Sequence, residues 1–368
     1  MLLSAIMTQP RTGEGGAATM HVDELDTPVM LVDLDKLEDN IVRLQRDLDR
    51  LGLKNRPHIK THKIPAIGWK QLEAGAIGIT CQKLGEAEVF AAAGFKDILI
   101  PYNIVGRSKV ERLIQLTFQA RVTVALDSEP TARGISEVAR AEGATVPVLI
   151  EMDSGSHRAG VQTPEEALAL ARLVHDLPGL AFEGLMCYPS RPHMKEVFGR
   201  TRELLKRDGF TVRVISGGGT GAQEISKEIG CTEHRSGTYI YNDLSVARSG
   251  RCTIEQCAMT VMVTVVSTAY PGKATVDGGS KTFTSDAISP DKPNGYCVEY
   301  PEIYLERMNE EHGILNTEKL QGQLRVGQRL NIIPLHACGT TNLHDYVAAH
   351  RGGKVVAIWP VLARGKIR

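Results

Sequence analysis

The feature that most constrains the fold is a strand–helix alternation running from residue 28 to residue 216. Short β-prone segments recur there, and amphipathic or Ala-rich segments with helical periodicity lie between them. Eight short strands alternating with helices favour a closed parallel barrel over an open sheet. The predicted class is therefore α/β, a (β/α)8 TIM-type barrel, with strands at Pro28–Leu34, Arg56–His62, Ile77–Gln82, Asp97–Tyr102, Arg121–Asp127, Val146–Asp153, Phe182–Tyr188 and Thr211–Ser216.

After about residue 250 the pattern changes to β-branched runs separated by Gly, Pro and Asn, which predicts an all-β second domain. We expect the barrel to span residues 28–250, and residues 21–27 to join residues 251–368 in the β domain. Residues 1–20 are small and polar, which predicts a disordered leader. The strongest β runs are Cys257–Thr268, Lys273–Asp277, Gly295–Glu299, Arg329–Ile333 and Lys354–Trp359.

Charge and cysteine content narrow the ligand class and the compartment. Basic and acidic residues number 43 each, so no charge excess indicates a nucleic-acid partner. Seven scattered cysteines without a C-x-x-C pair argue against a disulfide framework and predict a reducing, cytoplasmic location. No apolar run approaches membrane-spanning length. The expected partner is a small molecule, not nucleic acid or a membrane.

The segment Arg56-Pro-His-Ile-Lys-Thr-His-Lys63 is the first candidate for chemistry. If it is a barrel strand, Lys60 lies near the carboxyl end, where barrel enzymes place active residues. A lysine is a useful nucleophile when burial and nearby cations lower the pKa of its ammonium group. The alternative is a solvated lysine at a strand end.

A second candidate is the run Ser216-Gly-Gly-Gly-Thr-Gly221. Successive glycines let backbone N–H groups approach a ligand, and the loops after the last two barrel strands commonly hold phosphate. A flexible turn is the alternative. The run lacks the Gly-Lys-Ser/Thr of a triphosphate loop, and no G-x-G-x-x-G opens the first helix, which argues against ATP or a dinucleotide. A lysine and a phosphate cradle together indicate pyridoxal 5'-phosphate.

Four segments together resemble the D-threonine aldolase family, and the resemblance extends from about residue 24 to 368. This family belongs to the alanine-racemase-like, fold-type III enzymes that use pyridoxal phosphate, which also include the D-serine and D-threo-3-hydroxyaspartate dehydratases. The resemblance implies a cofactor-binding barrel with a C-terminal β domain. It also implies a homodimer whose sites are completed by the partner, for which Asp277–Asp286 is the candidate crossing segment. The four segments are Arg56–Lys63, Gln82–Ala87, Ser216–Thr220 and Asp277–Lys281.

The resemblance also implies roles for individual residues. Lys60 would form the Schiff base with the cofactor, Arg158 would bond its phenolic oxygen, and Arg235 would face its pyridine nitrogen. A ring nitrogen that faces an arginine stays unprotonated, so other groups must help to stabilise developing charge. The alternative for each arginine is a surface salt bridge. Further expected contacts with cofactor or substrate are Gln82, Tyr188, Gly218, Gly219, Thr220 and Tyr239.

His336-Ala-Cys338 is the candidate metal site. Alternate residues of an extended segment project to one side, so an imidazole and a thiolate can bind one metal ion. The alternative is a buried histidine and a small apolar cysteine. The segment resembles the family's metal site, in which His-x-Cys accompanies dehydratases, whereas Asn342–Asp345 downstream resembles aldolases. A thiolate favours Zn2+, while carboxylate and water favour Mn2+ or Mg2+.

The resemblance implies a metal-assisted lyase acting on D-β-hydroxy-α-amino acids. In aldol cleavage, His62 or a metal-bound water takes the hydroxyl proton, and glycine and an aldehyde result. In dehydration, Lys60 removes the α-proton, and a 2-oxo acid and ammonia result. Cleavage is the leading prediction, and dehydration or racemisation is the alternative. A small cofactor carrier would lack the β domain, and a barrel enzyme for a phosphorylated sugar remains if Lys60 holds no cofactor.

Overall fold

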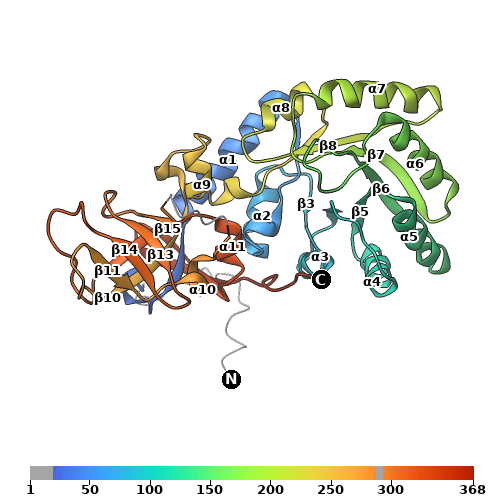
Figure 1. Ribbon diagram of the computed structural model, residues 1–368. Coiled ribbons are helices and arrows are strands. Elements are labelled where there is room, and N and C mark those ends of the chain that lie inside the picture. The colour runs from blue at the N-terminus through green and yellow to red at the C-terminus, as the bar shows by residue number, and fades with distance from the viewer. Residues whose placement is uncertain (1–19, 287–292) are drawn as a thin grey trace.

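The computed structural model describes residues 20–286 and 293–368, so the expected leader lies outside the described residues except for Met20. The chain forms a parallel α/β part and a β part, which lie at opposite ends of the molecule in Figure 1. This arrangement confirms the predicted fold class. Within the described residues, no helix is both long and apolar enough to span a bilayer.

The parallel sheet has eight strands in the order β2-β9-β8-β7-β6-β5-β4-β3. A parallel bridge between His58 and Thr80 joins the two ends of this sheet, as expected for a TIM-type barrel. The strands are β2 (Lys54–Asn55), β3 (Ile79–Thr80), β4 (Asp97–Ile100), β5 (Arg121–Leu126), β6 (Val146–Glu151), β7 (Leu180–Met186), β8 (Val214–Gly218) and β9 (Glu233–Arg235).

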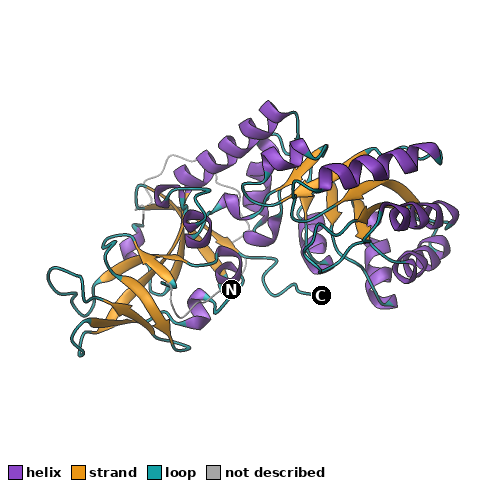
Figure 2. Ribbon diagram, turned by 45° about the horizontal axis from the view of Figure 1, so that its top comes forward, coloured by secondary structure: helices purple, strands orange, loops and turns teal. Residues whose placement is uncertain are grey.

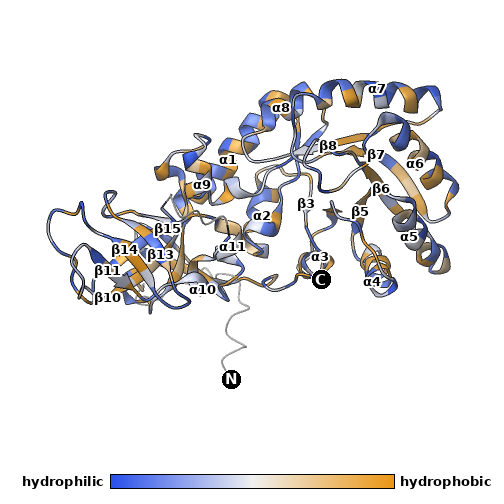
Figure 3. Ribbon diagram, viewed as in Figure 1, coloured by the Kyte–Doolittle hydropathy of each residue, from blue (hydrophilic) through white to orange (hydrophobic). Residues whose placement is uncertain are grey.

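Amphipathic helices cover the outside of the barrel (Figure 2). In α1 the apolar residues Leu37, Ile41, Leu44 and Leu48 recur at helical spacing and are all buried. The helices of Figure 3 accordingly alternate between hydrophilic and hydrophobic colour. The helices of this part are α1 (Leu34–Leu51), α2 (Pro65–Glu73), α3 (Leu84–Ala92), α4 (Arg107–Thr117), α5 (Glu129–Ala141), α6 (Pro164–Asp176), α7 (Met194–Arg207), α8 (Gln223–Glu228) and α9 (Leu244–Arg248).

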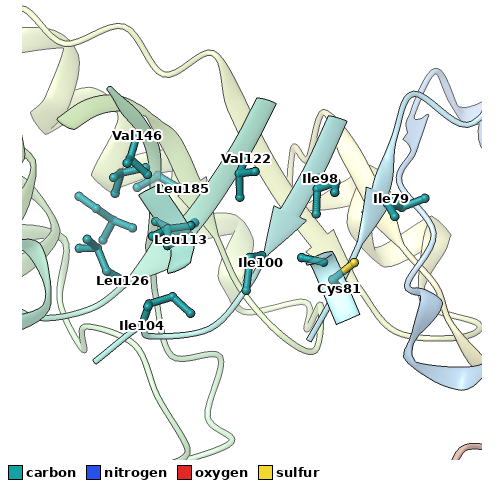
Figure 4. Close-up of a cluster of buried hydrophobic side chains, with 14 of the residues drawn as sticks. Ile79, Cys81, Ile98, Ile100, Ile104, Leu113, Val122, Leu126, Val146 and Leu185 are labelled. Carbon is teal, nitrogen blue, oxygen red and sulfur yellow. The ribbon is translucent and has the colours of Figure 1, made fainter. Parts of the chain in front are cut away.

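The barrel core is one large apolar cluster between the sheet and its helices. Figure 4 shows Ile98 and Ile100 of β4 and Val122 of β5, with Leu113 of α4 nearby. These side chains are at most 1% exposed. Burial of this kind fixes the strands and leaves the residues at their carboxyl ends free to build a site.

Several strand predictions need correction. Residues 28–34 were expected to form the first barrel strand, but β1 (Val29–Asp33) pairs with β10 and β16 in the other sheet. The eighth barrel strand is instead β9, which is short and polar and was not predicted. An apolar run does not identify its own pairing partner, and a buried Glu-His-Arg segment has no hydrophobic pattern.

The β part is a nine-stranded, mostly antiparallel sheet in the order β11-β14-β13-β12-β15-β10-β1-β16-β17. The five predicted β runs correspond to β10, β11, β12, β15 and β17, whereas β13, β14 and β16 were not predicted. The elements are β10 (Met259–Ser267), β11 (Lys273–Val276), α10 (Ser280–Phe283), β12 (Gly295–Cys297), β13 (Tyr304–Met308), β14 (Gly313–Asn316), β15 (Arg329–Pro334), α11 (Ala337–Thr341), β16 (Tyr346–Arg351) and β17 (Lys354–Pro360).

The last residues of the chain return to the barrel. The C-terminal segment (361–368) follows β17, and the backbone N–H of Ala363 donates to the carbonyl of Lys63 at 3.2 Å. The N–H of Gly85 at the start of α3 donates to the carbonyl of Arg368 at 2.9 Å. In Figure 1 the C-terminus accordingly lies beside α3. The two parts of the chain are therefore connected at the mouth of the barrel.

Candidate active site

Lys60 lies in a 3-10 helix rather than in a strand. The predicted strand Arg56–His62 is wrong, because β2 ends at Asn55, before this range, and the helix η2 spans Ile59–Thr61, so that only an isolated bridge at His58 remains. The Lys60 Nζ atom lies 5.9 Å from the centroid of the Tyr188 ring. The guanidinium carbon of Arg158 lies 5.1 Å from the same centroid. The structure thus brings together three predicted site residues from distant parts of the sequence.

His58 links Lys60 to Gln82. The Nδ1 atom of His58 accepts from the backbone N–H of Lys60 at 3.3 Å, so its Nε2–H donates to Gln82 Oε1 at 3.1 Å. Burial, followed by the charge of Lys60, holds the pKa of His58 well below its usual value, so the ring is neutral. Because the carbonyl oxygen of Gln82 is used here, its amide NH2 is the group left to meet a ligand.

His62 was predicted as a catalytic base, and the structure does not place it in the site. Its side chain is fully buried. The Nδ1 atom accepts from the N–H of Ile64 at 3.1 Å, and Nε2 donates to Gln71 Oε1 at 3.2 Å. Burial lowers the pKa of His62 to about 3. A histidine with both ring nitrogens bonded in the core has no free position for a substrate proton.

Tyr239 belongs to the same buried network. Its hydroxyl accepts from Gln71 Nε2 at 2.9 Å, and burial raises the pKa of the phenol. The network therefore runs from His62 through Gln71 to Tyr239. Tyr239 also lines a small cavity beside the glycine-rich turn. Its hydroxyl accepts this bond and keeps its own proton to donate, so its cofactor contact stays a prediction.

Arg235 is buried where β7, β8 and β9 end. Its guanidinium donates to the Ser216 hydroxyl and, at 2.9 Å, to the carbonyl of Cys187. Nearby Glu151 of β6 has a pKa above its usual value because burial outweighs the attraction of Arg235 and Arg158. The structure therefore places the two predicted arginines near the same buried carboxyl group.

The glycine-rich run has a different internal role from the one predicted. It begins within β8, which is the seventh barrel strand because β9 is the eighth. The N–H of Gly218 donates to Ser190 Oγ at 2.9 Å, and the N–H of Gly219 donates to the carbonyl of Arg235 at 3.1 Å. These two N–H groups are consequently occupied. A Cβ on Gly217 would lie 2.5 Å from Ser190 Oγ, so part of the glycine pattern reflects close packing.

The free donors are one step further along the turn. In residues 20–286 and 293–368, the N–H groups of Thr220 and Gly221 and the Thr220 hydroxyl have no hydrogen-bond partner. A cavity of about 100 Å³ adjoins them and is also lined by Ser236 and Arg251. Three unpaired donors and an arginine fit a phosphate group. The sequence analysis included the whole run and named Thr220 as a contact, but it did not single out Gly221 and it missed Arg251, because a glycine run does not show which N–H groups are used internally.

The predicted metal ligands come together, but not on one extended segment. His336 precedes α11, and Cys338 lies in its first turn. Hydrogen bonding to Cys338 raises the pKa of His336 to about 9, while burial opposes it. Burial opposes ionisation of Cys338, but its hydrogen bond to His336 and the charge of His336 lower the pKa of the thiol below its usual value. Imidazole nitrogen and thiolate sulfur are donors that suit zinc.

Two further contacts surround this pair. The Cys338 sulfur lies 3.2 Å from the Thr61 hydroxyl, and His336 Nδ1 lies 2.5 Å from Asp286 Oδ2. Among the residues that the structure describes, no group of three or more His, Cys, Asp or Glu residues has the arrangement of a complete metal site. Within the described part of the chain, His336 and Cys338 therefore remain a pair of candidate metal ligands.

The segment Asp277–Asp286 was the candidate for crossing to a partner. Asp277 accepts from the N–H of Thr264 at 2.8 Å and from the Thr27 hydroxyl at 2.6 Å. These contacts hold the start of the segment within its own β sheet. Its role in a dimer stays a prediction, because the structure describes one chain.

The barrel, the lysine at its mouth and the appended β sheet define the class of alanine-racemase-like, fold-type III enzymes, which depend on pyridoxal phosphate. The chain matches the family model described as "Alanine racemase, N-terminal domain" over residues 32–245. It matches "Putative serine dehydratase domain" over residues 258–350. The chain belongs to the D-threonine aldolase family within this class, whose named members are lyases.

Individual relatives agree with this assignment. The chain is 34% identical to D-threonine aldolase of an Arthrobacter species, over 93% of each chain. It is 32% identical to D-threo-3-hydroxyaspartate dehydratase of a Delftia species, over 86% of this chain and 92% of the relative. The crystal structure of D-threonine aldolase from Filomicrobium marinum matches with a TM-score of 0.85 at 32% identity, covering 96% of this chain and 100% of that chain.

Two other similar structures are variants of D-threo-3-hydroxyaspartate dehydratase, each 29% identical and covering 93% of this chain, with TM-scores of 0.84 and 0.82. One has alanine in place of a histidine. The other has alanine in place of a cysteine two positions further along, and is described as the metal-free form. They cover 96% and 98% of those chains.

Proposed function

We propose that this protein is a pyridoxal-phosphate- and divalent-metal-dependent lyase that cleaves D-β-hydroxy-α-amino acids to glycine and an aldehyde. The observation that carries the proposal is the 3.2 Å contact between Thr61 and Cys338. Thr61 follows Lys60 in the chain, so this contact brings the predicted metal ligands of the β domain next to the predicted cofactor lysine. Membership of a family with named aldolases supports the same reaction.

The residues at the barrel mouth fit the cofactor. Lys60 would bond its carbonyl carbon, and the free donors of Thr220 and Gly221 would hold its phosphate. Arg235 and Arg158 would lie at the ring. Bound pyridoxal phosphate withdraws electrons from the α-carbon of an amino acid. The amide NH2 of Gln82, oriented by His58, is available to bind an oxygen of the cofactor or the substrate.

His336 and Cys338 would hold the metal, with Asp286 orienting the imidazole. A bound divalent metal lowers the pKa of a coordinated hydroxyl group. Aldol cleavage must remove the proton of the substrate's β-hydroxyl, so the metal would make that step easier. His62 is not proposed as the acceptor of that proton, since both of its ring nitrogens are bonded in the core.

Dehydration is the second candidate function, and a specific observation favours it. His336 and Cys338 are two positions apart, as are the histidine and cysteine replaced in the two dehydratase variants. Dehydration needs the same β-hydroxyl and electron withdrawal, but it breaks the Cβ–O bond and yields a 2-oxo acid and ammonia. Racemisation is a third possibility within the fold class and requires no metal.

Product analysis separates these reactions. The purified protein, loaded with pyridoxal phosphate and metal, is incubated with D-threonine and with D-threo-3-hydroxyaspartate, and glycine and 2-oxo acid are assayed side by side. We expect glycine to form, and we expect its formation to stop after EDTA treatment. Oxo acid and ammonia without glycine would establish the dehydratase, and activity unaffected by EDTA would remove the metal from the proposal. Lys60→Ala is the control for the cofactor lysine.

We also propose that the protein is a cytoplasmic homodimer, in keeping with the family resemblance and its cysteine content. Light scattering after size-exclusion chromatography measures the oligomeric state. A monomer with full activity would contradict a site completed by a partner.

The division into a barrel of residues 28–250 and a β domain of residues 21–27 with 251–368 stays a prediction, except that β1 belongs to the β sheet.

A further inference from the structure

A buried ion pair includes Lys63, which lies three positions after the predicted cofactor lysine in the chain. Glu86 of α3 is 1% exposed and Lys63 is 7% exposed. Glu86 Oε1 accepts from Lys63 Nζ at 2.6 Å. Glu86 Oε2 accepts from the backbone N–H groups of Gln82 at 2.7 Å and Lys83 at 3.2 Å. We call these four residues the Glu86 network. One carboxylate therefore fixes three donors that come from two separate turns.

The Glu86 network continues to Lys60 through His58. Glu86 holds the backbone of Gln82, and the Gln82 side-chain oxygen accepts from His58 Nε2. His58 Nδ1 in turn accepts from the N–H of Lys60. Every link in this path is a hydrogen bond of 2.7 to 3.3 Å. Displacement of Glu86 is thus expected to change both the Gln82 amide and the turn that carries Lys60.

The same ion pair contacts the C-terminal segment. Lys63 has a positive φ of 57°, its N–H donates to the carbonyl of Ile59, and its own carbonyl accepts from the N–H of Ala363. Its Nζ atom also approaches the carbonyl of Ala363 at 3.5 Å. Lys63 therefore connects the Lys60 turn to the segment that follows the β domain.

We propose that Glu86 and Lys63 are positioning residues that set the placement of Lys60 and of the Gln82 amide, and couple both to the C-terminal segment. Both side chains are buried. A buried ion pair gains little net stability, because desolvation of its two charges offsets their attraction. One carboxylate accepts hydrogen bonds from all three donors, which instead indicates that it holds these groups in position. The consequence for catalysis rests on the proposed function.

Three variants test the proposal. Glu86→Gln removes the charge and leaves too few acceptor positions for the three donors. The double variant Lys63→Met with Glu86→Leu removes both buried charges and the acceptor of the Gln82 and Lys83 N–H groups, and replacing the ion pair by apolar side chains is expected to recover thermal stability. Glu88→Gln is the matched control, because Glu88 lies on the same helix but pairs with the half-exposed Arg112 and does not contact Gln82.

Hydrogen–deuterium exchange gives the first readout and needs no cofactor. In Glu86→Gln and in the double variant, we expect faster amide exchange in peptides covering residues 56–63 and 82–86, and unchanged exchange there in Glu88→Gln. Unchanged exchange at residues 56–63 in both variants would overturn the proposed path from Glu86 to Lys60.

Catalysis and spectroscopy give the second readout. With pyridoxal phosphate and metal added, Glu86→Gln is expected to lower kcat by about 100-fold with little change in KM, since misplacement of a reacting group acts on the chemical step. The pH midpoint of the visible absorbance of the bound cofactor should shift in parallel.

The double variant should recover its unfolding temperature without recovering kcat. Recovery of both would show a purely structural pair and overturn the proposal. A wild-type protein that binds no pyridoxal phosphate would reject the proposed function, and the exchange result would still decide the positioning role.

Discussion

The hydroxyl oxygen of Thr61 lies 3.2 Å from the sulfur of Cys338, although 277 positions separate the two residues in the chain. Thr61 belongs to the turn that carries Lys60, and Cys338 belongs to a short helix of the β part. This contact joins the two motifs that the sequence suggested separately, and it makes one composite site the simplest interpretation of both.

The first prediction concerns this contact. Thr61→Val keeps the shape of the side chain but removes the hydroxyl, so the Cys338 sulfur loses a hydrogen-bond partner. We expect metal affinity to fall by about tenfold, as for other groups that support metal ligands. Competition with a chromogenic chelator measures the affinity. Thr131→Val in α5 replaces another buried threonine, whose hydroxyl contacts Ser128 rather than a metal ligand, and should leave the affinity unchanged. Equal affinities for all three proteins would contradict a supporting role for Thr61.

The second prediction distinguishes a structural His62 from a catalytic one. His62→Gln disrupts the bonds to Gln71 and Ile64 and should lower the free energy of unfolding by about 1–3 kcal/mol. Product formation should persist below the lowered unfolding temperature, because the ring has no free nitrogen in the native state. A loss of turnover as complete as that of Lys60→Ala, in a variant that remains folded and binds the cofactor, would restore His62 as a base.

The third prediction is a loss of stability in acid. Burial lowers the pKa of both His62 and His234 to about 3 in the folded protein, against about 6.5 in the unfolded chain. The unfolded state therefore binds more protons in acid. The stability that the two neutral histidines contribute is fully present above a pH of about 6.5 and is lost as the pH drops toward 3. Each histidine should contribute a loss of about 2 kcal/mol between pH 7 and pH 5. Urea unfolding midpoints at the two pH values check the direction, and a midpoint that rises in acid would contradict it.

The fourth prediction concerns the turn proposed to hold phosphate. Gly221 has a φ of +79°, and a Cβ there would lie 2.5 Å from the Cδ atom of Arg251. Gly221→Ala should therefore displace Arg251 and weaken the affinity for pyridoxal phosphate. Gly209→Ala is the matched control, because Gly209 has a φ of +87° with nothing within 4 Å. Its strain of about 1–2 kcal/mol should lower stability without changing cofactor affinity.

Absorbance titration with pyridoxal phosphate measures both glycine variants. If Gly209→Ala weakens cofactor binding as much as Gly221→Ala does, the effect would reflect lost stability, and the turn would lose its assignment as the phosphate site.

The amino-acid sequence by itself determined the α/β alternation, the β-rich second part and the family. Period-two and helical patterns depend on neighbours within a few positions, so they can be read along the chain. The motifs around Lys60, Arg235 and His336 were also recognisable, because the chemistry of a site requires particular residue types at particular spacings.

Only the tertiary structure decided which sheet each strand joins and which polar groups remain free. β1 joined the β sheet and the unpredicted β9 completed the barrel, because strand pairing depends on distant segments. His62 proved to be a core residue, and Thr220 and Gly221 proved to be the free donors, because hydrogen bonds to Gln71, Ser190 and Arg235 form only after folding. The physical reason is the same in each case: burial and hydrogen bonding are shared among residues far apart in sequence, and no local pattern records them.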